Sequence, residues 1–225
     1  MTRLILACLL SVLLISNNAW ASTNLLLNEG FETVGSEYTK ALNWEWGTPD
    51  YHGSTWGNAS RESWRSHSGS FEGAIAGQWK GDTVGGWWQE KPAEPGVTYT
   101  MTAWFWADSF WTNQSDQGIK IEFFSGAALG ETLISSVFTN IQGIGETWVQ
   151  QSISAVAPTN ATWVRAVIWA QGVSWDGALQ FDDVSLVGEP GSVILISGLP
   201  LVMAGLLATP IITRMRRKTN HHQNP

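Results

Sequence analysis

Residues 97–107 alternate between two kinds of side chain. One face would carry Val97, Tyr99, Met101, Ala103 and Phe105, and the other Thr98, Thr100, Thr102, Trp104 and Trp106. A period of two is the pattern of a β-strand that buries one of its faces. The segment therefore predicts a strand whose Tyr99/Met101/Phe105 face is buried and whose opposite face presents two tryptophans.

Similar short runs occur at 119–124, 148–154, 161–170 and 179–187, and turn-rich stretches separate them. No part of residues 22–187 has sustained helical periodicity. The chain has 23 glycines and only 14% charged residues, a composition typical of short strands joined by turns. We therefore predict an all-β domain over residues 22–187, a sandwich or jelly roll.

The N-terminus has the features of a secretory signal peptide. Arg3 precedes an apolar run at 4–15, and Ala19-Trp20-Ala21 fits the small-x-small cleavage rule. Residues 1–21 are therefore predicted to direct secretion across the inner membrane and to be removed. The single cysteine, Cys8, lies in this segment, so the secreted domain has no cysteine with which to form a disulfide.

Near the C-terminus, residues 193–212 form an apolar run of 20 residues without a charge. A helix of that length spans the roughly 30 Å hydrocarbon core of a bilayer. Arg214, Arg216, Arg217 and Lys218 follow it, as expected on the cytoplasmic side. We predict one transmembrane helix within residues 188–218, a polar tail at 219–225 and a domain outside the cell.

The order Glu189-Pro190-Gly191, apolar span and basic cluster resembles the PEP-CTERM sorting signal of Gram-negative bacteria. The resemblance implies processing by an exosortase. Gly188 stands where that family has its first proline, and seven residues follow Lys218, so a retained single-pass anchor stays open. Either interpretation predicts delivery to the cell surface or the extracellular matrix, with at least transient anchoring.

The charge of the predicted domain excludes one class of partner. Residues 22–187 contain seven Lys or Arg and 18 Asp or Glu side chains. A nucleic-acid-binding domain needs a basic surface to neutralise phosphates. We therefore expect no nucleic-acid partner.

Four segments carry a further resemblance. They are Asn-Leu-Leu-Leu-Asn-Glu-Gly-Phe-Glu at 24–32, Ser-Gly-Ser-Phe at 68–71, Pro-Gly-Val-Thr-Tyr at 95–99 and Phe-Asp-Asp-Val-Ser-Leu at 181–186. In this order they resemble carbohydrate-binding modules of the galactose-binding-like jelly-roll group, of the family 4, 9 and 22 type. The resemblance implies an antiparallel two-sheet jelly-roll sandwich of about nine strands, with its terminal strands near one another.

The same resemblance implies a structural calcium ion. It nominates Glu32 and Asp182 as ligands, with Asp183 and the backbone carbonyl of Ser70 as further candidates. Alternation would place Asp182 on the face of Val184 and Leu186, where a lone carboxylate is costly. Calcium would compensate that charge, and extracellular sites bind it with a Kd of about 10⁻⁴ to 10⁻³ M. The alternative is that Glu32 and Asp183 are ordinary surface acids.

Tryptophan is unusually frequent, with 15 in the chain. An exposed indole suits the apolar face of a sugar ring, but Trp also fills cores. In 161–170, Trp163, Arg165 and Trp169 lie opposite Val164, Ala166 and Ile168. If this strand and 97–107 share a sheet, their outward residues form one aromatic groove. The predicted carbohydrate-binding residues are Trp104, Trp106, Trp163, Arg165, Trp169 and, with Gln89 beside it, Trp87.

We expect no enzymatic activity. The domain has no Gly-x-Ser-x-Gly motif and no cysteine nucleophile, and its histidines, His52 and His67, have no recognisable catalytic partner. No pair of carboxylates that would suit glycoside hydrolysis stands out. The sequence thus favours a non-catalytic, surface-delivered module that tethers polysaccharide through an aromatic face. The alternative is a structural matrix or adhesion protein whose sandwich binds protein partners or itself.

Overall fold

The computed structural model describes residues 23–47, 58–76, 83–111, 114–126, 132–141, 143–172 and 177–189. The predicted signal peptide, the apolar run at 193–212, the polar tail and His52 lie outside these ranges. Among the described residues, no helix has the length and apolar character needed to cross a membrane. All the regular structure described is β-strand, which confirms the predicted all-β class.

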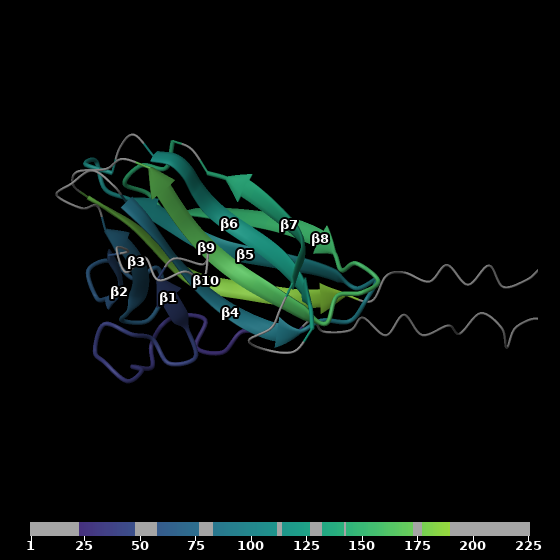
Figure 1. Cartoon of the computed structure of the whole chain (residues 1–225). Coiled ribbons are helices and arrows are strands. Elements are labelled where there is room, and N and C mark those ends of the chain that lie inside the picture. The colour runs from purple at the N-terminus through teal and green to yellow at the C-terminus, as the bar shows by residue number, and fades with distance from the viewer. Residues whose placement is uncertain are drawn as a thin grey trace, which may run out of the picture. The chain divides into compact units, whose positions relative to one another are not determined.

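The first sheet has the strand order β1-β4-β9-β6-β7, and all its neighbouring strands are antiparallel. Its strands are β1 (Glu45–Gly47), β4 (Thr83–Pro92), β9 (Trp163–Gly172), β6 (Gln114–Ser125) and β7 (Thr132–Asn140). The strands β4, β9 and β6 run side by side across the middle of the domain (Figure 1).

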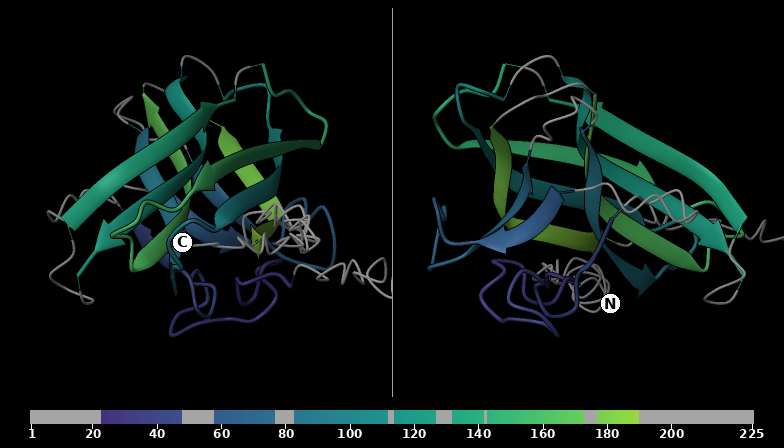
Figure 2. Two further views of the ribbon diagram at one scale, coloured as in Figure 1. Left: turned by 90° about the vertical axis from the view of Figure 1, so that its right-hand side faces the viewer. Right: turned by 60° about the vertical axis from the view of Figure 1, so that its left-hand side comes forward.

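The second sheet has the order β2-β3-β10-β5-β8 and is also antiparallel throughout. Its strands are β2 (Asn58–Glu62), β3 (Glu72–Ala76), β10 (Ala178–Glu189), β5 (Thr98–Ala107) and β8 (Val149–Val156). Figure 2 shows the two sheets as separate layers. This arrangement confirms the predicted two-sheet sandwich.

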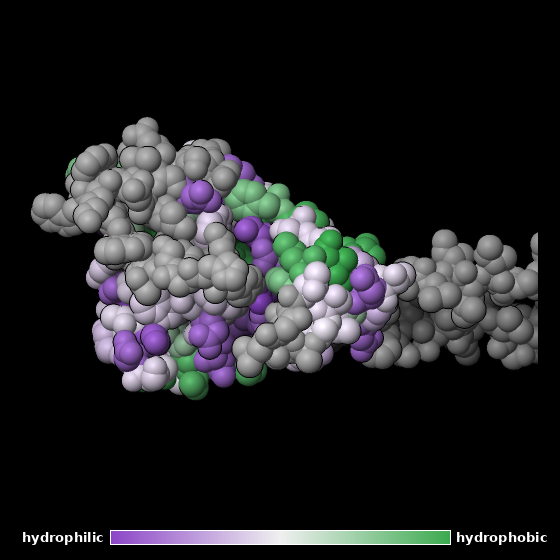
Figure 3. Space-filling view, viewed as in Figure 1, coloured by the Kyte–Doolittle hydropathy of each residue, from purple (hydrophilic) through white to green (hydrophobic). Residues whose placement is uncertain are grey.

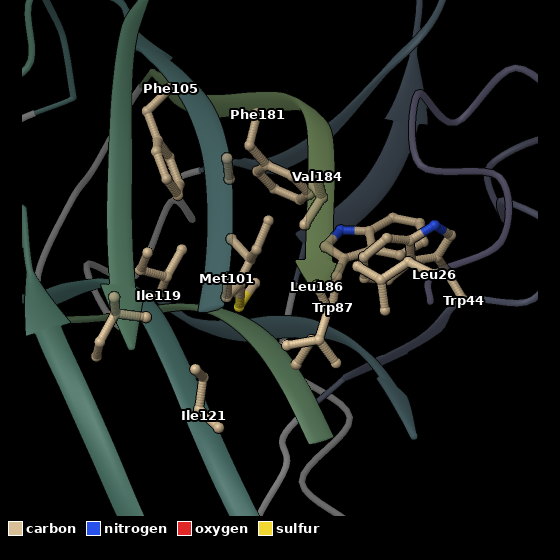
Figure 4. Close-up of a cluster of buried hydrophobic side chains, with 14 of the residues drawn as sticks. Leu26, Trp44, Trp87, Met101, Phe105, Ile119, Ile121, Phe181, Val184 and Leu186 are labelled. Carbon is tan, nitrogen blue, oxygen red and sulfur yellow. The ribbon is translucent and has the colours of Figure 1, made fainter. Parts of the chain in front are cut away.

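The core lies between the two sheets. On β5, Tyr99, Met101 and Phe105 are buried. Met101 and Phe105 face Ile119 and Ile121 of β6 across the sandwich (Figure 4). Val164, Ala166 and Ile168 of β9 belong to the same core. The period-two patterns of both strands were therefore assigned to the correct faces from the sequence.

The N-terminal segment of the domain is tied to its last strand. Leu25 N donates to Leu186 O at 2.8 Å, and the Asn24 side chain bonds to the backbone of Val184 and Leu186. Farther along this segment, Phe31 stacks on Trp44 at 4.9 Å and meets Phe181 edge-on at 5.4 Å. The two ends of the domain therefore lie together, as the resemblance implied.

Candidate functional site

The predicted carbohydrate-binding residues do not form one groove. Trp104 and Trp106 lie on β5 in the second sheet, whereas Trp163, Arg165 and Trp169 lie on β9 in the first. Both sets point away from the core, but to opposite sides of the sandwich. The expectation of a single aromatic groove, which required the two strands to share a sheet, is therefore wrong.

Trp87 is also unsuited to contact a ligand. It is 0% exposed, and its Nε1 donates a hydrogen bond of 3.1 Å to the carbonyl of Ala74 across the core. Gln89 shares that face of β4 and is buried as well. The outward member of the Trp-Trp pair is Trp88, which is half-buried. The position of Trp87 in the core therefore does not fit the predicted contact with a ligand.

A loop covers the outer face of the second sheet. His67 stacks on Trp104 with 4.1 Å between ring centroids and meets Trp148 edge-on at 5.4 Å. The guanidinium carbon of Arg65 lies 4.2 Å from the centre of a Trp106 ring, and Trp106 is only 3% exposed. Protein side chains therefore occupy the indole faces that a sugar would need.

On the outer face of the first sheet, charged side chains form a row across three neighbouring strands. Glu90 of β4 and Glu122 of β6 are the cross-strand partners of Arg165 on β9. The Arg165 guanidinium bonds to the Glu90 carboxylate and lies 3.6 Å from Glu122 Oε2. Lys120 Nζ lies 3.6 Å from Glu122 Oε1 and extends the row.

Aromatic rings surround this charged row. Lys120 Nζ lies 5.0 Å from the centre of a Trp169 ring and 5.8 Å from that of Phe138, and Arg165 lies 4.2 Å from that of Phe124. Trp163, at the end of β9, is half-buried. Hydrophilic and hydrophobic residues meet on the side of the domain that faces the viewer (Figure 3). We call Lys120, Glu122, Trp163, Arg165 and Trp169, with Glu90, the β9 face.

Arg165 is the deepest member of the β9 face. Its side chain is 1% exposed although it points away from the core. Desolvation by burial lowers the pKa of Arg165 to about 10, so the guanidinium stays protonated at neutral pH. A charge held out of water in this way is costly unless carboxylates compensate it. Glu90 and Glu122 supply these carboxylates, and their contacts with Arg165 hold the three side chains in position.

The four predicted metal ligands lie around one loop. Ser70 N donates to Glu32 Oε1 at 2.8 Å, and Ser68 Oγ and His67 Nδ1 contact the Asp183 carboxylate at 2.7 and 2.6 Å. A Cβ on Gly30 would lie 3.6 Å from Asp182 Oδ1 and 3.7 Å from Asp183 Oδ1. Acidic oxygens thus converge on the space beside Gly30.

The position of Asp182 differs from the sequence expectation. A β-bulge between Asp182 and Ser185, with Asp183 at φ 47°, interrupts the alternation of β10. Asp182 therefore pairs with Trp104 on the outer face, while Val184 and Leu186 face the core. The prediction that Asp182 shares their face is wrong because a bulge inserts one extra residue.

Asp182 is nevertheless fully buried beneath the loop, and it is not a lone carboxylate. The backbone N–H groups of His67 and Ser68 donate to its Oδ2, and that of Asp183 donates to its Oδ1. Desolvation outweighs these bonds and raises the pKa of Asp182 to about 7. Within the described ranges, no group of three or more His, Cys, Asp or Glu side chains has an arrangement that could hold a metal ion.

The β9 face contains two carboxylates, yet their arrangement differs from that of a glycosidase. Glu90 and Glu122 both lie against the Arg165 guanidinium. A glycosidase pair instead flanks the bond that is broken, with one group able to protonate the leaving oxygen. His67 is engaged with Asp183 and Trp104. These contacts give no support to a catalytic role.

Comparisons with known proteins find no matching family model and no matching curated protein. The fold is similar to the enzymatically active domain of bacteriophage CBA120 tailspike protein 4, with TM-score 0.54, 13% identity and coverage of 74% of this chain and 21% of that chain. The fold is also similar to the CBM22-1 xylan-binding domain from Paenibacillus barcinonensis Xyn10C, with TM-score 0.51, 11% identity and coverage of 75% of this chain and 96% of that chain.

A third similar structure is the arabinose-bound α-L-arabinofuranosidase MgGH51, with TM-score 0.51, 16% identity and coverage of 74% of this chain and 26% of that chain. The chain thus spans about a fifth of the tailspike chain and a quarter of the arabinofuranosidase. At these identities the likeness shows a shared fold. The chain therefore shares its β-sandwich fold with these structures, and the xylan-binding domain is one of them.

Proposed function

We propose that the protein is a non-catalytic carbohydrate-binding module that holds polysaccharide on the β9 face. One observation carries the proposal, namely the charged row Glu90, Arg165 and Glu122 beside Trp163, Trp169 and Lys120 on the outer side of the first sheet. The likeness to a xylan-binding domain supports it at the level of the fold.

The chemistry of the β9 face suits a sugar chain. An indole offers a flat apolar surface to the C–H groups of a pyranose ring, while carboxylates accept hydrogen bonds from hydroxyl groups and Lys120 donates them. Because the Glu90 and Glu122 carboxylates are held by Arg165, they lose little conformational freedom when a ligand binds. Trp163, Glu90 and Lys120 are the partly exposed members of the β9 face, so water reaches them.

This assignment keeps Trp163, Arg165 and Trp169 from the sequence prediction and adds Lys120, Glu90 and Glu122. It leaves out Trp87, which is in the core, and Trp104 and Trp106, whose rings are covered by His67 and Arg65. Arg165 and Trp169 form the floor of the face, since both are buried. Direct contact would fall mainly to Trp163, Glu90 and Lys120, which are only partly buried.

We also propose that the module is delivered to the cell surface or extracellular matrix. The support is in the sequence, in the predicted signal peptide at 1–21, the apolar run at 193–212 and the basic cluster that follows it. Processing by an exosortase-type enzyme and retention as a single-pass anchor are the two forms that delivery could take. A polysaccharide outside the cell would be the partner in both.

A structural matrix or adhesion role is a second candidate, and the edge strands favour it. The strand β7 ends the first sheet, contains no charged residue and exposes Leu133 and Val137. The strand β8 ends the second sheet and exposes Val149 and Val156. Uncharged edge strands with exposed apolar side chains can pair with another chain.

Calcium binding by Glu32, Asp182, Asp183 and Ser70 is a further part of the proposal, although in the described part of the chain no three acidic side chains form a metal-binding group by themselves. Hard carboxylate oxygens are the donors that calcium prefers, and those of Asp182 and Asp183 converge beside Gly30. These residues supply fewer than the six to eight oxygens that calcium takes, so backbone carbonyls and water would have to complete the site. The ion would tie the N-terminal segment to β10.

The test is binding of the protein to a panel of plant and bacterial polysaccharides, compared with its Trp163→Ala, Lys120→Ala and Trp64→Ala variants. Trp64 is a matched control because it is 56% exposed and its backbone N–H bonds to Glu72 of β3, in the second sheet. We expect saturable binding that Trp163→Ala and Lys120→Ala weaken at least tenfold, about 1.4 kcal/mol, and that Trp64→Ala leaves unchanged. Absence of binding across the panel, with self-association instead, would favour the matrix role.

A further inference from the structure

A pocket lies where the first sheet is incomplete at its edge. The strand β1 begins at Glu45, opposite Trp88, so the four β4 residues that follow Trp88 extend past it. The pocket beside them has a volume of about 460 Å³. It is lined by Leu27, Asn43, Glu45, Trp88, Gln89, Glu90 and Lys91. Pockets that hold small molecules have volumes of about 300–1,000 Å³.

The buried side of the pocket is fixed by the side chain of Gln89. Its Nε2 donates to Leu27 O at 2.6 Å, and its Oε1 accepts from Leu27 N at 3.1 Å. These two bonds hold the backbone of Leu27 beside β4. Asn43, which also lines the pocket, has a φ of 68° in the loop just before β1. The pocket is therefore bounded by a fixed backbone.

The lining combines the two kinds of group that recognise sugars. Trp88 is half-buried and lines the pocket, and Leu27 adds further apolar surface. Asn43, Glu45, Glu90 and Lys91 add an amide, two carboxylates and an ammonium group. Burial lowers the pKa of Lys91, in line with its place in a partly desolvated wall. The pocket thus offers hydrogen-bond donors and acceptors as well as an apolar ring.

Glu90 connects the pocket to the β9 face. Its carboxylate bonds to Arg165, the centre of the charged row, and the same residue lines the pocket. Trp88 and Glu45 are cross-strand partners, and Trp88 pairs on its other side with Val167 of β9. A chain of sugar residues that lies on the β9 face would therefore meet the pocket at the β1 edge of the sheet.

We propose that this pocket is a terminal subsite that binds the end residue of a neutral saccharide chain, with its ring against Trp88 and its hydroxyl groups on Asn43, Glu45, Glu90 and Lys91. The inference rests on the proposed carbohydrate-binding function and extends it to residues that the sequence did not nominate. A neutral sugar fits best because the two carboxylates and one ammonium group leave no excess of positive charge for an acidic ligand.

The test is calorimetric titration of the full chain with β-1,4-linked xylose, glucose and galactose oligosaccharides of two to six units. We expect Trp88→Ala to lower affinity for the longer oligosaccharides about tenfold, while shorter ones that occupy only the β9 face lose little. Glu45→Gln should lower it about threefold. Glu45 is exposed, so this variant is expected to fold, and Glu37→Gln is its matched control at an exposed acid outside the pocket.

The outcomes separate the two proposals. If Trp163→Ala abolishes binding while Trp88→Ala and Glu45→Gln bind every oligosaccharide like the wild-type protein, the terminal subsite is wrong and the β9 face is right. If Trp88→Ala and Glu45→Gln lose affinity while Trp163→Ala does not, the pocket is supported and the β9 face is wrong. If the wild-type chain binds neither oligosaccharide nor polysaccharide, both proposals fail.

Discussion

The imidazole of His67 lies flat on the indole of Trp104, with 4.1 Å between the ring centroids and 16° between the planes. His67 is held in this position because its Nδ1 also contacts Asp183 Oδ2 at 2.6 Å. The stack links the loop that covers the second sheet to β5 and β10. Trp104 thus serves the fold, although its place on an outer face resembles that of a sugar platform.

We therefore expect Trp104→Ala to affect stability and not carbohydrate binding. Loss of the stack and of part of the buried indole should lower the free energy of unfolding by about 1–3 kcal/mol. Chemical denaturation would measure this change, and polysaccharide retention at a temperature where the variant is folded would measure binding. A Trp104→Ala variant with native stability and no retention would contradict this role and return Trp104 to the binding site.

Arg165 is expected to be the most sensitive residue of the β9 face. Replacing it with leucine leaves Glu90 and Glu122 without the guanidinium that compensates them, and Glu122 is buried. Removing one partner of a buried ion pair costs about 3–5 kcal/mol. Lys120→Ala is the matched control, because its partly exposed pair with Glu122 should contribute less than about 1 kcal/mol. Equal unfolding free energies for the two variants would contradict the view that Arg165 forms a stabilising buried ion pair with Glu90 and Glu122.

The sequence predicts which face of a strand is buried wherever polar and apolar residues alternate regularly. The faces of β5 and β9 follow from their period of two, since any other register would move Tyr99, Met101 and Ile168 out of the core. The likeness of the first and last segments to a known family also placed the two ends of the domain together correctly, as the hydrogen bond from Leu25 N to Leu186 O shows.

The site was harder to predict because it depends on which strands become neighbours. Trp104 and Trp163 both point outward, but sheet order separates them, and no local pattern encodes that order. The bulge at Asp183 reverses the face of Asp182, and its positive φ has no clear signal in Phe-Asp-Asp-Val. The strand β4 was missed because Gly85 and Gly86 interrupt its pattern, so Trp87 and Trp88 could not be assigned to faces.

The titration of Asp182 should make the fold less stable as pH rises. Burial raises its pKa from the usual 3.8 to about 7 in the folded protein, so between these values the folded protein holds a proton that the unfolded chain has released. Its contribution is therefore fully present below about pH 4 and is lost as pH rises to about 7. Urea unfolding of wild type and Asp182→Asn from pH 4 to 8, in chelator, would measure the difference.

The difference between the two proteins is the quantity to follow, because burial also raises the pKa of Glu72, which would titrate in both. We expect the stability advantage of wild type over Asp182→Asn to shrink between pH 4 and 7 and to stay level above that. An advantage that grows with pH over this range would mean that the Asp182 carboxylate is stabilised as an anion in the fold.

Calcium should restore the stability that the fold loses at neutral pH when Asp182 ionises. A ligand that binds only the folded state stabilises it, and above Kd the gain rises with the logarithm of the ligand concentration. A cation beside Asp182 and Asp183 also favours their ionised forms. We expect millimolar calcium at pH 7.5 to raise the melting temperature by several degrees relative to chelator, given a Kd of about 10⁻⁴ to 10⁻³ M. Glu32→Gln and Asp182→Asn should each reduce the shift.

Magnesium is the control, since its stricter octahedral geometry suits this loop less well. Identical melting curves with calcium and chelator would show that the backbone N–H groups of His67, Ser68 and Asp183 compensate Asp182 without a metal ion.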